Sequence, residues 1–86
     1  MGTNFEDIAL EHLMSWMKTD KKIADKIYKL IQDIHRNGAG RGMRKPERLK
    51  HIDGWSRRID QANRLVYDIE EDGNLHILSC KGHYED

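Results

Sequence analysis

The stretch KKIADKIYKLIQDIH, residues 21–35, decides how the rest of the chain can fold. Its apolar residues recur every three or four positions, which places them along one side of an α-helix. They are Ile23, Ile27, Leu30, Ile31 and Ile34. Thr19 or Asp20 can cap the start of this helix. The glycine-rich RNGAGRG at 36–42 ends it.

A second amphipathic helix precedes it at residues 6–18. Its apolar residues have the same spacing and predict one buried face, made of Leu10, Leu13, Met14 and Met17. Two adjacent helices joined by a short link form a hairpin, and their apolar faces need a further layer to cover them.

Three segments in the C-terminal half have the composition of β-strands: WSRRI (55–59), RLVYDI (64–69) and LHILSC (75–80). The turns DQAN (60–63) and EEDGN (70–74) connect them. We therefore predict an α+β fold in which two helices pack on an antiparallel meander. Residues 2–5 could add a short strand, and the irregular stretch 36–54 is long enough to suggest a functional loop.

Length and composition predict one small domain spanning residues 1–86. Hydrophobic residues are 37% and charged residues 35%. No apolar run approaches the roughly 20 residues of a membrane span, and the first residues do not resemble a signal peptide. Cys80 is the single cysteine, which excludes an intrachain disulfide. We expect a cytoplasmic protein without a membrane partner.

Charge is unevenly distributed, although fifteen basic and fifteen acidic residues balance overall. Residues 36–64 carry nine Lys or Arg and three Asp or Glu, a net charge of +6. Residues 65–86 carry one and six, a net charge of −5. This segregation predicts either a basic face for an anionic partner or an ordinary solvated surface.

The residue types suit cleavage of RNA through its own 2′-hydroxyl. That reaction needs a base, cations beside the phosphate and an acid, and it needs no metal. Glu47 could be the base and His83 the acid, with Tyr84 stacking on a nucleotide. The candidate cations are Lys45, Lys50, Arg58 and Arg64. Each of these residues could equally be plain solvated surface or a weak ion-pair partner.

Other chemistry has less support in the sequence. The five histidines are scattered and form no ligand pair with Cys80, so we expect no metal site. The GAGRG segment (38–42) lacks the Lys-Ser/Thr of a phosphate-binding loop. We expect no cofactor, and Cys80 is expected in the core rather than as a nucleophile.

Four motifs in order, KPERLKH (45–51), GWSRRI (54–59), NRLVY (63–67) and CKGHY (80–84), resemble the YoeB/Txe toxins of the RelE superfamily. The resemblance covers nearly the whole chain. It implies two N-terminal helices on a twisted antiparallel sheet. It also implies an mRNA endonuclease that acts in the ribosomal A site and leaves a 2′,3′-cyclic phosphate. The implied partners are a YefM/Axe-type antitoxin, the ribosome with its mRNA, operator DNA through the antitoxin complex only, and a second copy of the toxin.

The resemblance assigns roles to individual residues. It implies Glu47 as general base, Arg64 as the transition-state arginine and His83 as general acid. It places a phosphate contact on Lys50, and it places the aromatic neighbour of the acid on Tyr84. The arginine pair of the second motif falls on Arg57 and Arg58. Because neighbouring strand residues face opposite ways, Arg58 is expected on the active face.

Arg44 and Arg48, with Lys45 named above, complete the expected RNA-binding set. The chain departs from the family pattern in a short linker at 52–54, in Asn63 where a histidine is usual, and in Glu85 and Asp86 after the last motif. Two other functions stay open. One is a non-catalytic module that binds RNA or an acidic antitoxin, and the other is a structural corepressor subunit.

Overall fold

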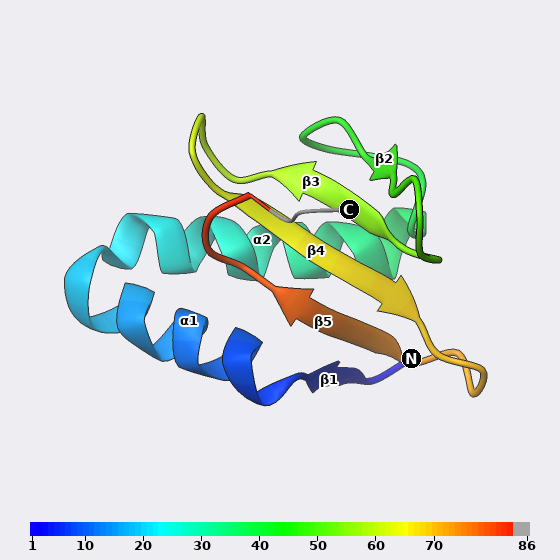
Figure 1. The fold of residues 1–86 in the computed structure, drawn as a ribbon, viewed down its shortest axis with the longest axis horizontal. Helices are drawn as coiled ribbons and strands as arrows, with labels where there is room; N and C mark the ends of the chain where they lie inside the picture. Colours follow the sequence, from blue (N-terminus) through cyan, green and yellow to red (C-terminus); the bar gives the residue numbers. More distant parts are fainter. Residues whose placement is uncertain (84–86) are drawn as a thin grey trace.

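The computed structural model describes residues 1–83 and contains two helices and five strands in that range (Figure 1). In chain order they are β1 (Thr3–Phe5), α1 (Asp7–Thr19), α2 (Lys21–Asn37), β2 (Glu47–Arg48), β3 (Trp55–Arg58), β4 (Arg64–Ile69) and β5 (Leu75–Ser79). Both predicted helices and all three predicted strands are confirmed to within a few residues. The short strand suggested at 2–5 is present, and β2 adds a strand inside the stretch expected to be irregular.

The five strands form one sheet in the order β1-β5-β4-β3-β2. The meander β3-β4-β5 is antiparallel, as predicted. β2, which was not predicted, pairs with β3 and is also antiparallel. β1 differs, because it pairs with β5 in parallel, Thr3 opposite Leu75 and Phe5 opposite Ile77. The sheet is therefore mixed rather than purely antiparallel. Parallel neighbours need a long connection, and here almost the whole chain lies between the two strands.

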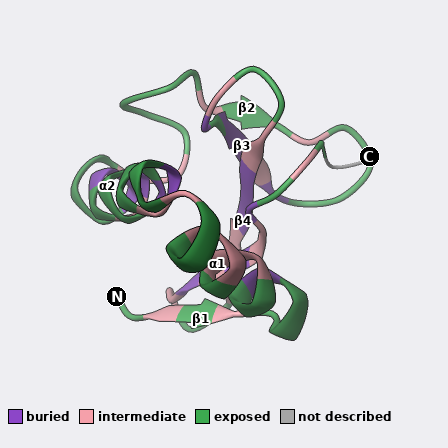
Figure 2. Cartoon of the chain, turned by 90° about the vertical axis from the view of Figure 1, so that its left-hand side faces the viewer, coloured by how far each residue is buried: buried purple, intermediate pink, exposed green. Residues whose placement is uncertain are grey.

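Both helices lie on one face of the sheet, and the core fills the space between them and the strands (Figure 2). In α2 the side chain of Asp20 accepts hydrogen bonds from the N–H groups of Lys22 and Ile23, which confirms the predicted N-cap. The buried residues of α2 are Ile23, Ile27, Leu30, Asp33 and Ile34. The opposite face of the sheet carries no helix in the described part of the chain.

The predicted buried face of α1 is wrong for three of its four residues, whereas Leu13 packs against the core as predicted. Leu10, Met14 and Met17 are about half exposed, at 46%, 52% and 55%. Ala9 is the buried residue of this helix, and Trp16 packs against the core from the same side. A small residue and an indole lie against β5, so the flexible methionines remain at the surface.

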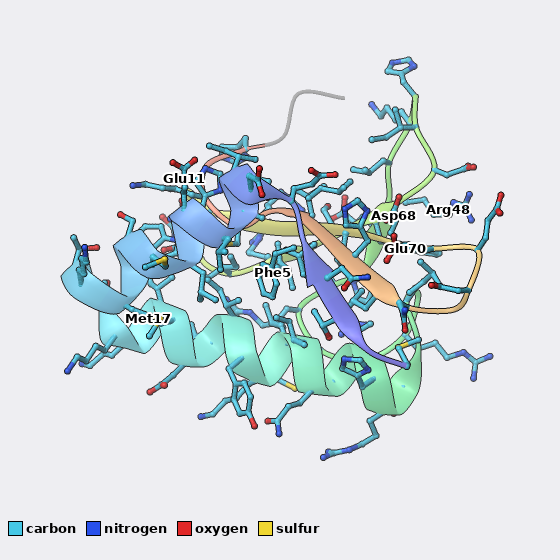
Figure 3. All side chains as sticks on the ribbon, turned by 90° about the horizontal axis from the view of Figure 1, so that it is seen from below. Phe5, Glu11, Met17, Arg48, Asp68 and Glu70 are labelled. Atoms are coloured by element: carbon cyan, nitrogen blue, oxygen red, sulfur yellow. The ribbon has the colours of Figure 1, made fainter. Side chains whose placement is uncertain are left out.

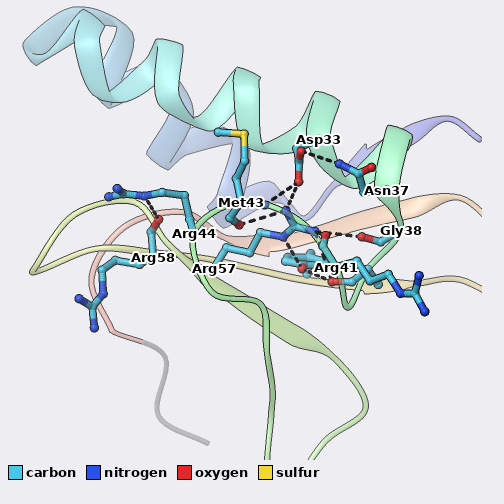
Figure 4. Close-up of polar contacts among 10 residues, drawn as sticks. Asp33, Asn37, Gly38, Arg41, Met43, Arg44, Arg57 and Arg58 are labelled. Carbon is cyan, nitrogen blue, oxygen red and sulfur yellow. Dashed lines mark hydrogen bonds and ion pairs between the residues drawn. The ribbon is translucent and has the colours of Figure 1, made fainter.

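A buried arginine fixes the loop that leads into β2 (Figure 4). Arg57 on β3 points into the helix side of the sheet and is fully buried, with its guanidinium paired to the carboxylate of Asp33 on α2. The same guanidinium donates to the carbonyl oxygens of Gly38 at 2.9 Å, Arg41 at 2.5 Å and Met43 at 3.2 Å. Segment 38–43 is thus tied to the core immediately before Glu47.

Within residues 1–83, no helix combines the length and the apolar character needed to cross a bilayer.

Candidate active site

Strand alternation gathers the key polar side chains on the helix-free face of the sheet. Residues directly opposite each other in antiparallel strands share a face, and Glu47 pairs with Ser56 while Arg58 pairs with Arg64. Since Arg57 is buried on the helix side, its neighbours Ser56 and Arg58 lie on the other side. Arg57 and Arg58 thus face opposite sides of the sheet, with Arg58 on the helix-free face.

This face holds a pocket of about 280 Å³. Its walls come from three separate places: β2 with the segment after it, the middle of the sheet, and the segment after β5. The lining residues are Glu47, Arg48, Leu49, Lys50, Ser56, Arg64 and His83. The fold therefore brings together residues that are up to 36 positions apart, from 47 to 83, as the candidate active site requires.

Glu47 and Arg64 form the centre of the pocket. Oε1 of Glu47 lies 3.8 Å from Nη1 of Arg64, with the two side chains 56% and 22% exposed. The same Nη1 lies 3.3 Å from Oγ of Ser56 and donates to it. Ser56 thereby orients the arginine, a role that was not predicted from the sequence. In this pocket the carboxylate can act as a proton acceptor, and the guanidinium beside it can compensate the negative charge of a phosphate.

His83 reaches the pocket because the segment before it is hydrogen-bonded to the start of β4. The N–H of Arg64 donates to the carbonyl oxygen of Gly82 at 3.1 Å. The N–H of Gly82 donates to Oδ1 of Asn63 at 2.7 Å. Asn63 is itself held by the carboxylate of Asp60. The asparagine that departs from the family pattern therefore has a structural task beside the candidate acid.

The remaining predicted cations lie around the pocket or contribute to the scaffold. Arg44 donates from Nε to the carbonyl oxygen of Arg58 at 3.0 Å and from Nη2 to that of Ile59 at 2.7 Å, so its guanidinium braces the end of β3 (Figure 4). Lys45 and Arg58 belong, with Arg44, to the described residues outside the pocket lining. Tyr84 lies outside the described residues.

Arg48 lies on the border between the pocket and a more acidic surface. Its guanidinium stacks over the ring of Trp55, 5.1 Å from the centroid, and lies 3.8 Å from Asp53. Figure 3 shows it close to Asp68 and Glu70, which line the neighbouring hollow with it. These carboxylates compete with any phosphate for the Arg48 guanidinium.

Two expectations about other chemistry can be compared with the described residues. Cys80 is fully buried, and this burial raises the pKa of its thiol to about 11. The expectation of a core cysteine is confirmed. Among residues 1–83, no three His, Cys, Asp or Glu side chains are arranged to hold a metal ion.

Residues 5–84 match the family described as YoeB-like toxin of bacterial type II toxin-antitoxin system. Toxin YoeB of Escherichia coli (strain K12) is 49% identical over 72 residues, which cover 80% of this chain and 82% of that protein.

Solved structures agree with the sequence comparison. The YoeB dimer from Staphylococcus aureus superposes with a TM-score of 0.90 at 41% identity, covering 98% of both chains. The heterotetrameric YoeB-YefM toxin-antitoxin complex from the same organism gives a TM-score of 0.89 at 40% identity, again covering 98% of each chain.

Proposed function

Because this chain belongs to the YoeB family of toxins from bacterial type II toxin–antitoxin systems, we propose that it is an endoribonuclease that cuts mRNA in the ribosomal A site. The observation that carries the proposal is the convergence of Glu47, Arg64 and His83 on one pocket from three parts of the chain. These are the side chains that a metal-independent transfer at phosphorus needs: a base, a cation and an acid.

The proposed reaction is an internal attack of the RNA on its own phosphate. Glu47 takes the proton of the 2′-hydroxyl, and the resulting oxygen bonds to the adjacent phosphorus. The bond from phosphorus to the 5′-oxygen breaks, and His83 gives that leaving oxygen a proton. The products are a 2′,3′-cyclic phosphate and a free 5′-hydroxyl. Atoms and charge balance without a cofactor.

The cations compensate the charge that develops on the phosphoryl oxygens. Arg64 is proposed for this task because Ser56 and the backbone contact to Gly82 hold it in place. Lys50 lines the same pocket and is proposed as a phosphate contact. Lys45, Arg58, Arg44 and Arg48 would then guide the RNA over the surrounding surface by charge rather than by contact with the reacting phosphate. Tyr84 is proposed to stack on a nucleotide.

The proposed biological setting follows from the family. A YefM/Axe-type antitoxin would neutralise the toxin, and the complex would bind operator DNA through the antitoxin. The dimer and the YoeB-YefM complex of the Staphylococcus aureus relatives support a homodimer and such a complex here. The chain would act as a single domain of residues 1–86 on ribosome-bound mRNA in the cytoplasm.

The test is primer extension on an mRNA translated in a reconstituted system, comparing the wild type with Glu47→Gln. We expect wild-type cuts within A-site codons and a loss of at least about 100-fold in the variant, the range of general acid–base catalysis. Glu71→Gln is a matched control, because Glu71 is an exposed carboxylate in the turn before β5. It should cut at the wild-type rate.

A non-catalytic binding module is the competing function, since the same basic surface could hold RNA or an acidic peptide. In that case neither protein cuts, and Glu47→Gln binds RNA more tightly because one negative charge is gone. That result would overturn the endonuclease proposal. A purely structural corepressor would show neither cleavage nor a change in RNA affinity.

A further inference from the structure

All three polar atoms of Cys80 are engaged by helix α1. Its N–H donates to Nδ1 of His12 at 3.3 Å, and its carbonyl oxygen accepts from Nε1 of Trp16 at 2.8 Å. Its Sγ donates to the carbonyl oxygen of Ala9 at 3.5 Å. These three residues are separated by three and four positions, so they lie on one side of the helix. Cys80 is therefore docked on α1 by its whole backbone and its side chain.

The surroundings of this contact strengthen it. The ammonium group of Lys81, the next residue, lies 5.1 Å from the centroid of the Trp16 ring, within the range of a cation–π interaction. Burial and the Lys81 charge together lower the pKa of His12, against a smaller opposite effect of Glu11. A neutral imidazole can accept the N–H of Cys80, whereas a protonated one cannot.

The chain that follows Cys80 is held by residues at the start of the neighbouring strand β4. Gly82 is bound at both its N–H and its carbonyl oxygen by Asn63 and Arg64. His83 comes directly after this doubly held residue. Two neighbouring anchor points, on α1 and on β4, thus precede the side chain that reaches the pocket.

We propose that the face of α1 formed by Ala9, His12 and Trp16 positions His83 for catalysis, although none of the three lines the pocket. The proposal rests on the proposed function, in which His83 donates a proton to the leaving oxygen. A proton donor must lie within hydrogen-bond reach of its acceptor, and a misplacement of about 1 Å can cost about 100-fold in rate. The docking of Cys80, two residues before Gly82, limits such a displacement of His83.

The experiment uses variants that remove single hydrogen bonds. Trp16→Phe removes the indole N–H and keeps most of the ring packing. His12→Leu removes the acceptor, whereas His12→Asn offers an amide oxygen close to the position of Nδ1. Met14→Leu is the matched control, because Met14 is on the same helix and 52% exposed.

Two readouts separate positioning from plain stability. In ribosome-programmed cleavage at saturating enzyme, Trp16→Phe and His12→Leu should lower kcat by about 3–10-fold, the equivalent of one net hydrogen bond, with KM unchanged within about twofold. Amide hydrogen exchange at Cys80 and Gly82 should become about 3–10-fold faster in both variants. His12→Asn should recover most of both effects, and Met14→Leu should show neither.

Wild-type kcat in a folded Trp16→Phe and a folded His12→Leu would overturn the proposal. So would equal losses in His12→Leu and His12→Asn, because the acceptor would then be irrelevant. If the wild type itself fails to cut, the proposed function fails. The exchange measurement still decides whether α1 anchors this segment, and unchanged exchange at Cys80 refutes the anchor.

Discussion

Replacing Asp33 with asparagine should destabilise the fold by about 3–5 kcal/mol, the range for removing one partner of a buried ion pair. The side chain of Arg57 is 0% exposed and that of Asp33 is 8% exposed, so water cannot take over the lost interaction. Asparagine keeps the shape of Asp33 and can still accept from the N–H of Met43, which lies 3.0 Å from Oδ2. The variant therefore removes the charge beside a buried guanidinium, together with the Oδ1 acceptor that receives the Asn37 amide at 2.8 Å.

The magnitude is large for a domain of this size. Domains have a total free energy of unfolding of about 5–15 kcal/mol, so this single change removes a large share of it. With a urea m-value of about 1–3 kcal/mol/M, the unfolding midpoint should fall by roughly 1–5 M. Equilibrium unfolding followed by the fluorescence of Trp16 and Trp55 measures the shift. Asp25→Asn, an exposed carboxylate on the same helix, should change stability by less than about 0.5 kcal/mol.

The pH dependence of the effect gives a second check. Burial alone would raise the pKa of Asp33, but hydrogen bonds from Met43, Arg57 and Asn37 and the charge of Arg57 outweigh it, so the pKa lies below its ordinary value of 3.8. The stabilisation is complete above pH 3.8 and is lost as the pH falls through the lower folded value. The difference between wild type and Asp33→Asn should therefore narrow below pH 4. A variant as stable as wild type at pH 7 would refute the reasoning.

Three further outcomes are expected. Gly42→Ala should destabilise the protein by at least about 1–2 kcal/mol in urea unfolding. Gly42 has φ of +108°, and an added Cβ would collide with the carboxylate of Asp33. Gly73→Ala is the control that separates backbone strain from this collision, because Gly73 is also at positive φ but has open space around it. The thiol of Cys80 should react with iodoacetamide at pH 8 only after unfolding, because burial raises its pKa to about 11; fast labelling of the folded protein would contradict its burial. Since the pKa of His12 in the folded protein lies below 6.5, the contribution of its neutral imidazole to stability is complete above pH 6.5 and declines below it. His12→Asn should abolish this part of the dependence of the unfolding free energy on pH. An unchanged dependence would exclude His12 as its source.

Periodicity predicted the elements well where one face of an element is buried. The stripe from Ile23 to Ile34 is the buried face of α2, and the strand composition of residues 64–69 corresponds to β4. Local pattern failed in α1, where three of the four apolar residues expected in the core, Leu10, Met14 and Met17, are exposed and Leu13 alone packs against it. The choice there depends on contacts with Cys80 and Lys81, more than sixty positions away, which no local pattern contains.

For the candidate site too, some residues could be predicted from the sequence and others could not. Chemistry and motif resemblance selected Glu47, Arg64 and His83, and the pocket contains all three. Sequence reasoning missed the supporting residues, because a buried pair such as Asp33 and Arg57 looks like two more surface charges in a chain with 35% charged residues. The parallel placement of β1 was also unpredictable, since a three-residue strand has no pattern that specifies its neighbour.

The pairing of β1 with β5 also sets the order in which the protein can be completed during its synthesis. Residues 3–5 leave the ribosome first, and their partners at 75–77 are made about seventy residues later. At about 5–20 residues per second, this interval lasts roughly 4–14 seconds. During that time the helical hairpin has no complete sheet to pack against. Glu47 and Arg64 are already synthesised, but His83, which completes the pocket, is not. A nascent chain is therefore without the assembled pocket until residue 83 has been added and has reached Glu47 and Arg64.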